Sequence, residues 1–177
     1  MLDKAKRVLI LGCSGSGKST LTRLICDHYS LPAVHLDKHF WSPGWTTPST
    51  EKWREKVIKL SNDDQWVMDG TYSDTFDIRF PLADLIIIVN LPRITCLYRV
   101  IMRIFKYSKK KRRPDIALGC DEKFNLNFYK YIWTYNQKEL PQILDAIKTH
   151  ECEEKVIFLS TNREVSTFVS DNISAKG

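Results

Sequence analysis

The sequence predicts an α/β fold in which a five-stranded parallel sheet lies between two layers of helices. Short apolar runs alternate along the chain with stretches whose apolar residues recur at helical spacing, which is typical of parallel strands joined by helical crossovers. One run, residues 85–89, is apolar throughout, as expected for a strand covered on both faces. With 177 residues and no internal repeat, the chain is expected to form a single domain, residues 1–177.

Each expected strand is a short apolar run bounded by polar or turn residues. The first run ends at Gly12, the second at Asp37 and the third at Asp69, while the fourth follows Asp84. The strands are therefore expected at residues 7–11, 33–36, 65–68, 85–89 and 155–159.

Two helices are expected in the first half of the chain. Leu21, Leu24 and Ile25 have the spacing of one apolar helix face, which indicates a helix directly after the first loop. Ser49 is a favourable N-cap residue, so a second helix is expected over residues 50–60.

Three further helices are expected in the second half. Pro92 suits the first turn of a helix that extends to Tyr107. Residues 124–149 have helical character, with a break expected near Pro141 because proline lacks a backbone N–H. Asn162 is expected to cap the last helix.

The loop after the first strand, GCSGSGKST at residues 12–20, matches G-x-x-x-x-G-K-[ST], the phosphate-binding P-loop. A strand precedes it and a helix follows it, which aims backbone N–H groups and a helix N-terminus at one anion. Lys18 is expected to reach the β- and γ-phosphates of a nucleotide, and the Ser19 hydroxyl to bind Mg²⁺. The predicted nucleotide-binding residues are Gly12, Ser14, Gly15, Ser16, Gly17, Lys18, Ser19 and Thr20. The fold is therefore expected to be the three-layer P-loop NTPase fold.

Ligands of parallel sheets bind beyond the carboxyl ends of the strands. Gly12, Asp37, Asp69, Asn90 and Ser160 are expected at such ends, facing one crevice. Asp69 is predicted to complete the Mg²⁺ site with Ser19 by holding a metal-bound water, the alternative being a turn aspartate.

Asp37 is predicted to lie near a phosphoryl acceptor, where it would accept the proton of a hydroxyl group or orient it. Its place between His35 and His39 leaves a metal site as one alternative and a surface turn as another. Trp41 is a candidate lid over the acceptor, or an ordinary core residue. Arg79 is predicted to clamp an anionic acceptor, unless it forms a salt bridge with Asp77 or Asp84.

Eight basic residues and no acidic one lie between Arg99 and Arg113. We expect a mobile lid at about residues 106–122, and we expect Arg99 and Arg103, with Arg112 or Arg113, to meet the charge of a transferred phosphoryl group. A nucleic-acid contact and a solvated basic loop are the alternatives.

The segment after the last strand is expected beside the P-loop, where a nucleotide base would lie, so Arg163 is a further nucleotide-binding candidate. The chain has no N-K-x-D guanine-recognition motif, and adenine is therefore the expected base. These features predict ATP and Mg²⁺ as ligands.

The composition indicates the protein's partners and cellular environment, but not its reaction. A net charge of +6 favours anionic partners, which phosphate binding alone could explain. The five cysteines are scattered without a C-x-x-C motif, which favours free thiols in a reducing cytoplasm. No apolar run approaches the roughly 18 residues that a membrane span needs. The oligomeric state is not indicated.

The chain resembles adenylate-kinase-related P-loop proteins of the DNA topology modulation protein family. The similarity runs through nearly the whole length, in the P-loop and in HLD at 35–37, FW at 40–41, PGW at 43–45, WVMDGTYS at 66–73, DIRFPLAD at 77–84 and RRPD at 112–115. It implies a nucleoside-monophosphate-kinase-like fold with a short basic lid. The chain has TYS at 71–73 where adenylate kinases have the F-P-R run that positions AMP, so AMP is not the implied acceptor.

Two functions are therefore expected from the sequence. The first is a phosphotransferase that moves the ATP γ-phosphate to an unidentified small molecule. The second is an ATP-responsive nucleic-acid-binding regulator that affects DNA topology, with the basic segment on DNA phosphates. The short basic cluster without a recognised DNA-binding motif makes the second the weaker alternative.

Overall fold

The centre of the protein is a five-stranded sheet in the order β2-β3-β1-β4-β5, with every neighbouring pair parallel. The structure, a computed structural model, describes residues 2–107, 115–120 and 124–173. The strands are β1 (Arg7–Gly12), β2 (Ala33–His35), β3 (Trp66–Asp69), β4 (Leu85–Val89) and β5 (Val156–Leu159). The predicted five-stranded parallel sheet is confirmed.

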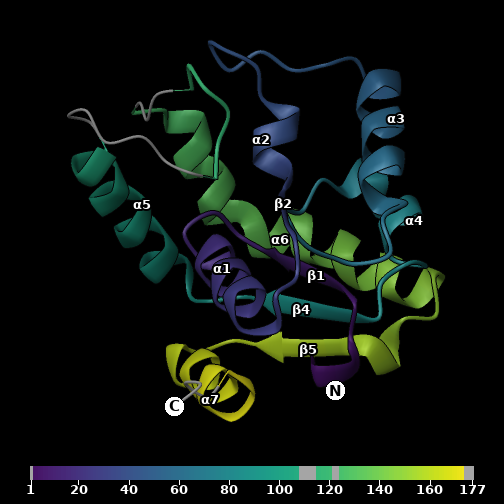
Figure 1. Cartoon of the computed structure of the whole chain (residues 1–177). Coiled ribbons are helices and arrows are strands. Elements are labelled where there is room, and N and C mark those ends of the chain that lie inside the picture. The colour runs from purple at the N-terminus through teal and green to yellow at the C-terminus, as the bar shows by residue number, and fades with distance from the viewer. Residues whose placement is uncertain (1, 108–114, 121–123, 174–177) are drawn as a thin grey trace.

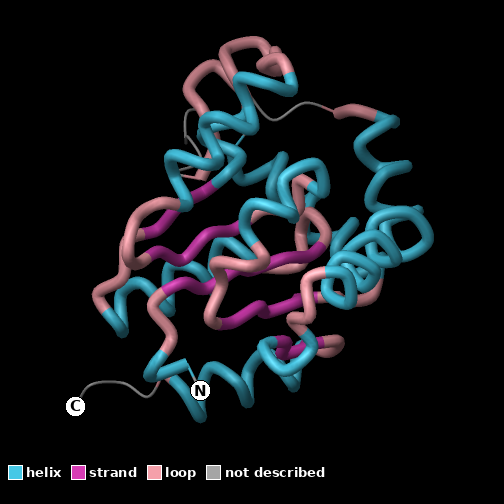
Figure 2. The backbone as a smooth tube through the Cα atoms, turned by 90° about the vertical axis from the view of Figure 1, so that its right-hand side faces the viewer, coloured by secondary structure: helices cyan, strands magenta, loops and turns pink. Residues whose placement is uncertain are grey.

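Helices cover both faces of the sheet, with α1 in front and α6 behind in the view of Figure 1. The layering is also visible after a quarter turn (Figure 2). The helices are α1 (Lys18–Tyr29), α2 (Leu36–Phe40), α3 (Thr50–Ser61), α4 (Phe76–Arg79), α5 (Arg93–Tyr107), α6 (Leu126–Thr149) and α7 (Asn162–Asn172). Single 3₁₀ turns lie at Leu2–Lys4, Ser73–Thr75 and Glu153–Lys155.

The core confirms why the strands could be recognised in the sequence. Every residue of β4 is buried, as a strand between two helical layers requires. All five cysteines are free, four of them buried. No helix in the described ranges is long and apolar enough to cross a membrane.

Two short helices, α2 and α4, were not expected. The second strand ends at His35, one residue earlier than predicted, because α2 begins at Leu36. Neither helix has a side-chain N-cap hydrogen bond, and each spans five residues or fewer, too short to show helical periodicity. Both are fixed by tertiary packing, as the fully buried Leu36 illustrates.

Two predictions about helix ends were wrong. Helix α6 continues through Pro141 without a break, since Pro141 is exposed and Ile143 beyond it is fully buried. The missing N–H costs one hydrogen bond, which the packing of the following turn outweighs. The N-cap of α7 is Thr161 rather than Asn162, because the Thr161 hydroxyl accepts the Glu164 N–H at 3.1 Å. Ser49 caps α3 as predicted.

Candidate nucleotide and acceptor site

A cavity of about 1140 Å³ opens beyond the carboxyl ends of β1, β2 and β3. It contains most of the residues that the sequence singled out, namely Gly12, Ser14, Gly15, Gly17, Lys18, Ser19, Thr20, Asp37, Trp41, Asp69, Arg99 and Arg103. Asn90 and Ser160 follow β4 and β5 but do not line this cavity. The Ser160 N–H instead donates to the Glu164 carboxylate at the start of α7. The crevice is thus built on one half of the sheet and on α5 and α6.

Two P-loop glycines are required by close backbone contacts. A Cβ at Gly12 would lie 2.2 Å from the Val89 carbonyl oxygen, and one at Gly15 would lie 2.4 Å from that of Cys96. Both glycines have positive φ, of 143° and 83°. The loop is therefore packed directly against the end of β4 and the first turns of α5.

The loop lysine lies folded over the P-loop. Lys18 Nζ donates to the Cys13 carbonyl oxygen at 2.9 Å, and Lys18 lines the cavity. Ser16 differs from its neighbours, because its side chain is buried and faces a second, smaller cavity of about 250 Å³. Any contact of Ser16 with a phosphate would therefore use its backbone.

Asp69 ends β3 and is 4% exposed. Its Oδ2 atom accepts hydrogen bonds from Thr22 Oγ1 and His35 Nδ1, both at 2.9 Å. Its Oδ1 atom has no hydrogen-bond partner within the described part of the chain. Asp69 and Ser19 line the same cavity, and oxygen donors of this kind suit Mg²⁺.

The bond between His35 and Asp69 predicts a pH-dependent contribution to stability. Burial lowers the pKa of His35, but the hydrogen bond and charge of Asp69 outweigh it, so the pKa is raised above the usual 6.5. Protonated His35 therefore stabilises the fold at pH below about 6.5, and this contribution is lost as the pH rises through the raised pKa. In urea titrations at acidic and alkaline pH, His35→Gln should lose less stability on alkalinisation than the wild type. Equal losses would contradict the assignment.

Asp37 lies on α2 rather than on a strand. Tyr72 Oη donates to Asp37 Oδ1 at 2.6 Å, while Asp37 Oδ2 makes no hydrogen bond with the described residues. Because α2 begins at Leu36, the two-residue alternation ends there and His35, Asp37 and His39 do not form a shared metal-binding face. Among the described residues no group of three His, Cys, Asp or Glu side chains is arranged to hold a metal ion.

The prediction that Arg79 clamps an acceptor was wrong. Arg79 is fully buried in α4 and does not line the cavity. The salt bridges considered for it are also not formed, since Asp77 pairs with Arg54 at 2.6 Å and Asp84 accepts backbone N–H groups at the start of β1.

Arg79 instead holds the loop that follows β3. Its guanidinium donates to the carbonyl oxygens of Gly70, Thr71 and Tyr72 and to the Thr75 hydroxyl. The short helix α4 turns its side chain inward, toward these carbonyls. The buried arginine thus fixes the segment that carries Tyr72, which in turn contacts Asp37.

Two of the arginines predicted to meet the phosphoryl group lie at the cavity. Arg99 donates to the Ser16 carbonyl at 3.2 Å and to Asn162 Oδ1 at 2.8 Å, and Arg103 lines the cavity one turn further along α5. Arg112 and Arg113, with most of the expected lid, lie outside the described residues. Arg163 is exposed on the first turn of α7 and does not line the cavity, because Asn162 is the residue of that turn that faces α5.

Several cavity residues were not found from the sequence. They are Tyr72, Asp74, Asp115, Phe128, Tyr131 and Glu139. Tyr72 could have been suspected from its place just after Asp69 and Gly70. Tyr131 and Glu139 could not, since both lie on a long helix and only its packing across the sheet brings them to the cavity.

Comparisons with known proteins agree with this architecture. Three solved structures share the fold at 12–15% identity. They are shikimate kinase from Bacteroides thetaiotaomicron (14% identity, 94% of this chain and 95% of that chain, TM-score 0.55), shikimate kinase from Acinetobacter baumannii in complex with shikimate (12%, 99% and 97%, 0.57), and a sugar kinase from Janibacter sp. HTCC2649 (15%, 96% and 95%, 0.51). At this level of identity the likeness establishes the fold alone.

Sequence comparison gives the family. No curated protein matches the chain. The family model described as ABC transporter matches residues 1–166, which includes the P-loop and the whole parallel sheet. Together with the strand–loop–helix geometry around Lys18, this match establishes that the chain belongs to the P-loop NTPases, in the family described as ABC transporter, and that its fold is that of the small P-loop kinases.

Proposed function

We propose that the protein is a phosphotransferase that moves the γ-phosphoryl group of ATP to a hydroxyl group of a small molecule. The observation that supports this most strongly is the composition of the 1140 Å³ cavity, which joins the P-loop and two arginines of α5 to Asp37, a carboxylate whose Oδ2 atom makes no hydrogen bond with a described residue. An enzyme that only hydrolysed ATP would have no need for an aromatic-lined space beyond the phosphates.

The residues divide into roles by position. The P-loop amides and Lys18 would hold the phosphates, and Ser19 with Asp69 would hold Mg²⁺, whose charge offsets that of the phosphates. Arg99 and Arg103 would stabilise the charge on the transferred group. Asp37 accepts the proton of the acceptor hydroxyl as its oxygen bonds to the γ-phosphorus, and the bond from that phosphorus to the bridging oxygen of ADP breaks.

The direct test is release of ADP from MgATP across a panel of acceptors. The panel should contain nucleosides, nucleoside monophosphates, sugars and cyclic hydroxy acids. Stimulation of ADP release by one compound, with a phosphorylated product detected by mass spectrometry, is the expected result. Absence of any phosphorylated product while ATP still binds would count against the phosphotransferase proposal.

Replacing Asp37 by asparagine should lower kcat by about a hundredfold, because general-base catalysis contributes about 10²–10⁴. The asparagine oxygen can still accept the Tyr72 hydroxyl, so the fold and the Kd for ATP should stay unchanged. Tyr72→Phe, which removes only that hydrogen bond, should lower kcat by about tenfold. If Asp37→Asn retained wild-type kcat, Asp37 would not be the base.

The resemblance to DNA topology modulation proteins supports a second candidate, an ATP-responsive DNA-binding regulator. The sequence feature in its favour is the run Lys109–Lys110–Lys111–Arg112–Arg113. Against it, Arg99 and Arg103 line the cavity and are thus withdrawn from any DNA-facing surface. DNA binding through this run should fall steeply between about 50 and 200 mM salt. We expect gel-shift titrations with duplex DNA at low salt to show no retention, and salt-sensitive retention would favour the regulator.

A further inference from the structure

Rings and carboxylates line the cavity on elements other than the P-loop and the two helices that flank it. The rings are Trp41, Trp45, Tyr72, Phe128 and Tyr131, and the carboxylates are Asp37, Asp74, Asp115 and Glu139. They come from α2 and the loop after it, the loop after β3, the segment 115–120 and α6, and we call this part the acceptor end. We infer that the acceptor is a ring-bearing alcohol without a negative charge, an inference that rests on the proposed phosphotransferase function.

The rings are held in place by other aromatic residues. Trp41 and Trp45 are 5.3 Å apart in an edge-to-face arrangement. Tyr72 packs on Phe40 at 4.7 Å and on the fully buried Trp53 at 5.0 Å. Rings fixed in this way offer faces and edges to a flat or ring-shaped ligand at little cost in entropy.

The carboxylates make the acceptor end electronegative. The pKa of Tyr72 is raised, first by burial and then by the charge of Asp37. The pKa of Tyr131 is also raised by burial, and the charges of Glu139 and Asp37 add to this shift. A phosphate or carboxylate group on an acceptor would meet the same negative charges, whereas an uncharged or cationic ring would not.

The described lysine and arginine side chains of the cavity come from other elements. They are Lys18 and Arg23 on α1 and Arg99 and Arg103 on α5, the two helices that flank the P-loop. Arg79, which could have served an anionic acceptor, is buried against the carbonyls of residues 70–72. Apart from Asp27 on α1 and Asp69 at the end of β3, the described residues therefore divide the charge of the cavity by element, with lysine and arginine side chains on α1 and α5 and carboxylates at the acceptor end.

Matched pairs of compounds test the inference by direct binding. Adenosine and AMP, and shikimate methyl ester and shikimate, differ within each pair in one anionic group. Quenching of tryptophan fluorescence, with a non-hydrolysable ATP analogue and Mg²⁺ present, should give a Kd at least tenfold lower for the uncharged member. Equal or tighter binding of the charged members, or no binding by either uncharged compound, would overturn the inference.

A charge-neutralising variant sharpens the test. Glu139→Gln should strengthen binding of the anionic member of each pair by about tenfold and change that of the uncharged member by less than threefold. Asp145→Asn, on the exposed face of the same helix, should change neither. Because binding and ADP release are measured separately, selective binding without turnover would contradict the phosphotransferase proposal and leave the charge preference standing.

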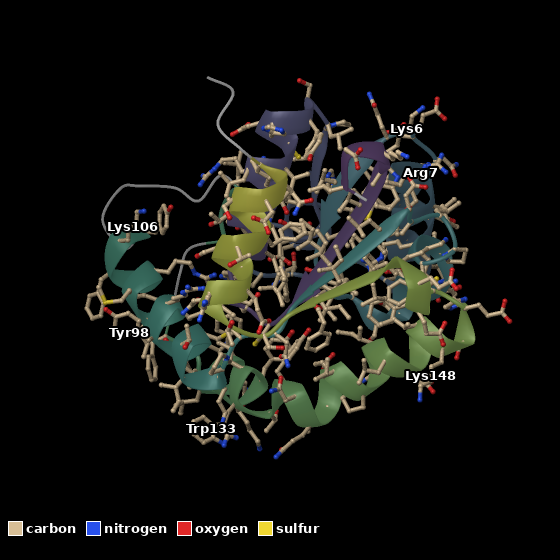
Figure 3. The ribbon with its side chains drawn as sticks, turned by 90° about the horizontal axis from the view of Figure 1, so that it is seen from below. Lys6, Arg7, Tyr98, Lys106, Trp133 and Lys148 are labelled. Atoms are coloured by element: carbon tan, nitrogen blue, oxygen red, sulfur yellow. The ribbon has the colours of Figure 1, made fainter. Side chains whose placement is uncertain are left out.

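The outer face of α5 supports a second, independent inference. Five large apolar side chains form one stripe along three turns of this helix, and Trp133 of α6 lies beside it. Figure 3 shows Tyr98 and Trp133 on the outer side of the two helices. The exposed fractions are 70% for Ile94, 63% for Tyr98, 43% for Ile101, 48% for Met102, 72% for Phe105 and 48% for Trp133. We propose that this stripe pairs with the same stripe of a second copy of the chain.

The area and the charge pattern favour a second copy over other occupants. With about 200 Å² per large side chain, the exposed fractions amount to roughly 700 Å². A standard protein interface buries about 800 Å² per partner. The stripe is straight and can meet its own copy across a two-fold axis. A lipid surface would favour several free cations flanking the stripe. Of the described cations of α5, Arg99 and Arg103 line the cavity, Arg93 stacks on Trp133 at 4.0 Å, and Lys106 lies over the Tyr107 ring at 5.6 Å.

Sedimentation equilibrium from about 1 to 100 µM should detect a dimer of the wild-type chain. The double variant Tyr98→Glu with Phe105→Glu should be monomeric over this range and unchanged in its circular dichroism, since both side chains are mostly exposed. Ile58→Glu, at an exposed apolar position on α3, should remain dimeric. A monomeric wild type at 100 µM, or a dimeric double variant, would overturn the proposal. Wild-type monomers that co-sediment with anionic vesicles would assign the stripe to a membrane instead.

Discussion

Lys18→Ala is expected to lower the rate of phosphoryl transfer by about a hundredfold to a thousandfold. Removal of one preorganised charged donor from a transition state costs about this much. The fold should be unaffected, because the only hydrogen bond that Lys18 Nζ makes to a described residue is to the Cys13 carbonyl of the same loop. The measurement is the initial rate of ADP formation with saturating MgATP and an active acceptor.

A matched lysine controls for the loss of charge. Lys59→Ala removes an exposed lysine from α3, far from the P-loop in sequence and outside the cavity, and should retain the full rate. A Lys18→Ala enzyme that turned over at the wild-type rate would show that the P-loop does not bind the transferred phosphoryl group.

Arg79→Ala is expected to lower the free energy of unfolding by about 3–5 kcal/mol. The substitution leaves the buried Gly70 and Thr71 carbonyls without their side-chain donor, removes one donor each from the Tyr72 carbonyl and the Thr75 hydroxyl, and empties the space of a fully buried side chain. For a domain of this size the loss corresponds to a fall in Tm of about 10 °C. Thermal unfolding followed by circular dichroism measures it.

A variant of Arg54 distinguishes the contribution of arginine burial to the free energy of unfolding from that of ion pairing. It forms a bidentate salt bridge with Asp77, but the pair is partly exposed, so Arg54→Ala should cost less than about 1 kcal/mol. Arg79→Lys keeps the charge without the planar fork and should fall between the two alanine variants. If Arg79→Ala were no more harmful than Arg54→Ala, the buried arginine would not be holding the loop.

Local sequence was enough to locate the sheet and the P-loop because both depend on contiguous residues. The strand at 85–89 is apolar at every position, and the glycines of residues 12–17 stand at fixed spacing before Lys18. The same holds for the cap at Ser49, where one side chain bonds to a backbone group three residues away. Such interactions leave their pattern in the order of the amino acids.

The features that the sequence did not predict depend on contacts between residues that are not contiguous in the chain. Nothing adjacent to Arg79 in the sequence indicates that its partners are carbonyls seven to nine residues earlier, and nothing near Pro141 indicates that the following turn is anchored by Ile143 in the core. Glu139 and Tyr131 reach the acceptor end only through the packing of α6 across the sheet. These features depend on tertiary contacts, which a single sequence does not encode locally.

The close approach of Gly15 to the Cys96 carbonyl has a mechanical consequence. A loop that touches a helix backbone without an intervening side chain cannot move alone, and Arg99 adds a second link through the Ser16 carbonyl. A ligand that displaces the P-loop must therefore displace α5, whose other face bears the apolar stripe. Nucleotide occupancy and self-association then become thermodynamically linked, and each must alter the equilibrium constant of the other by the same factor.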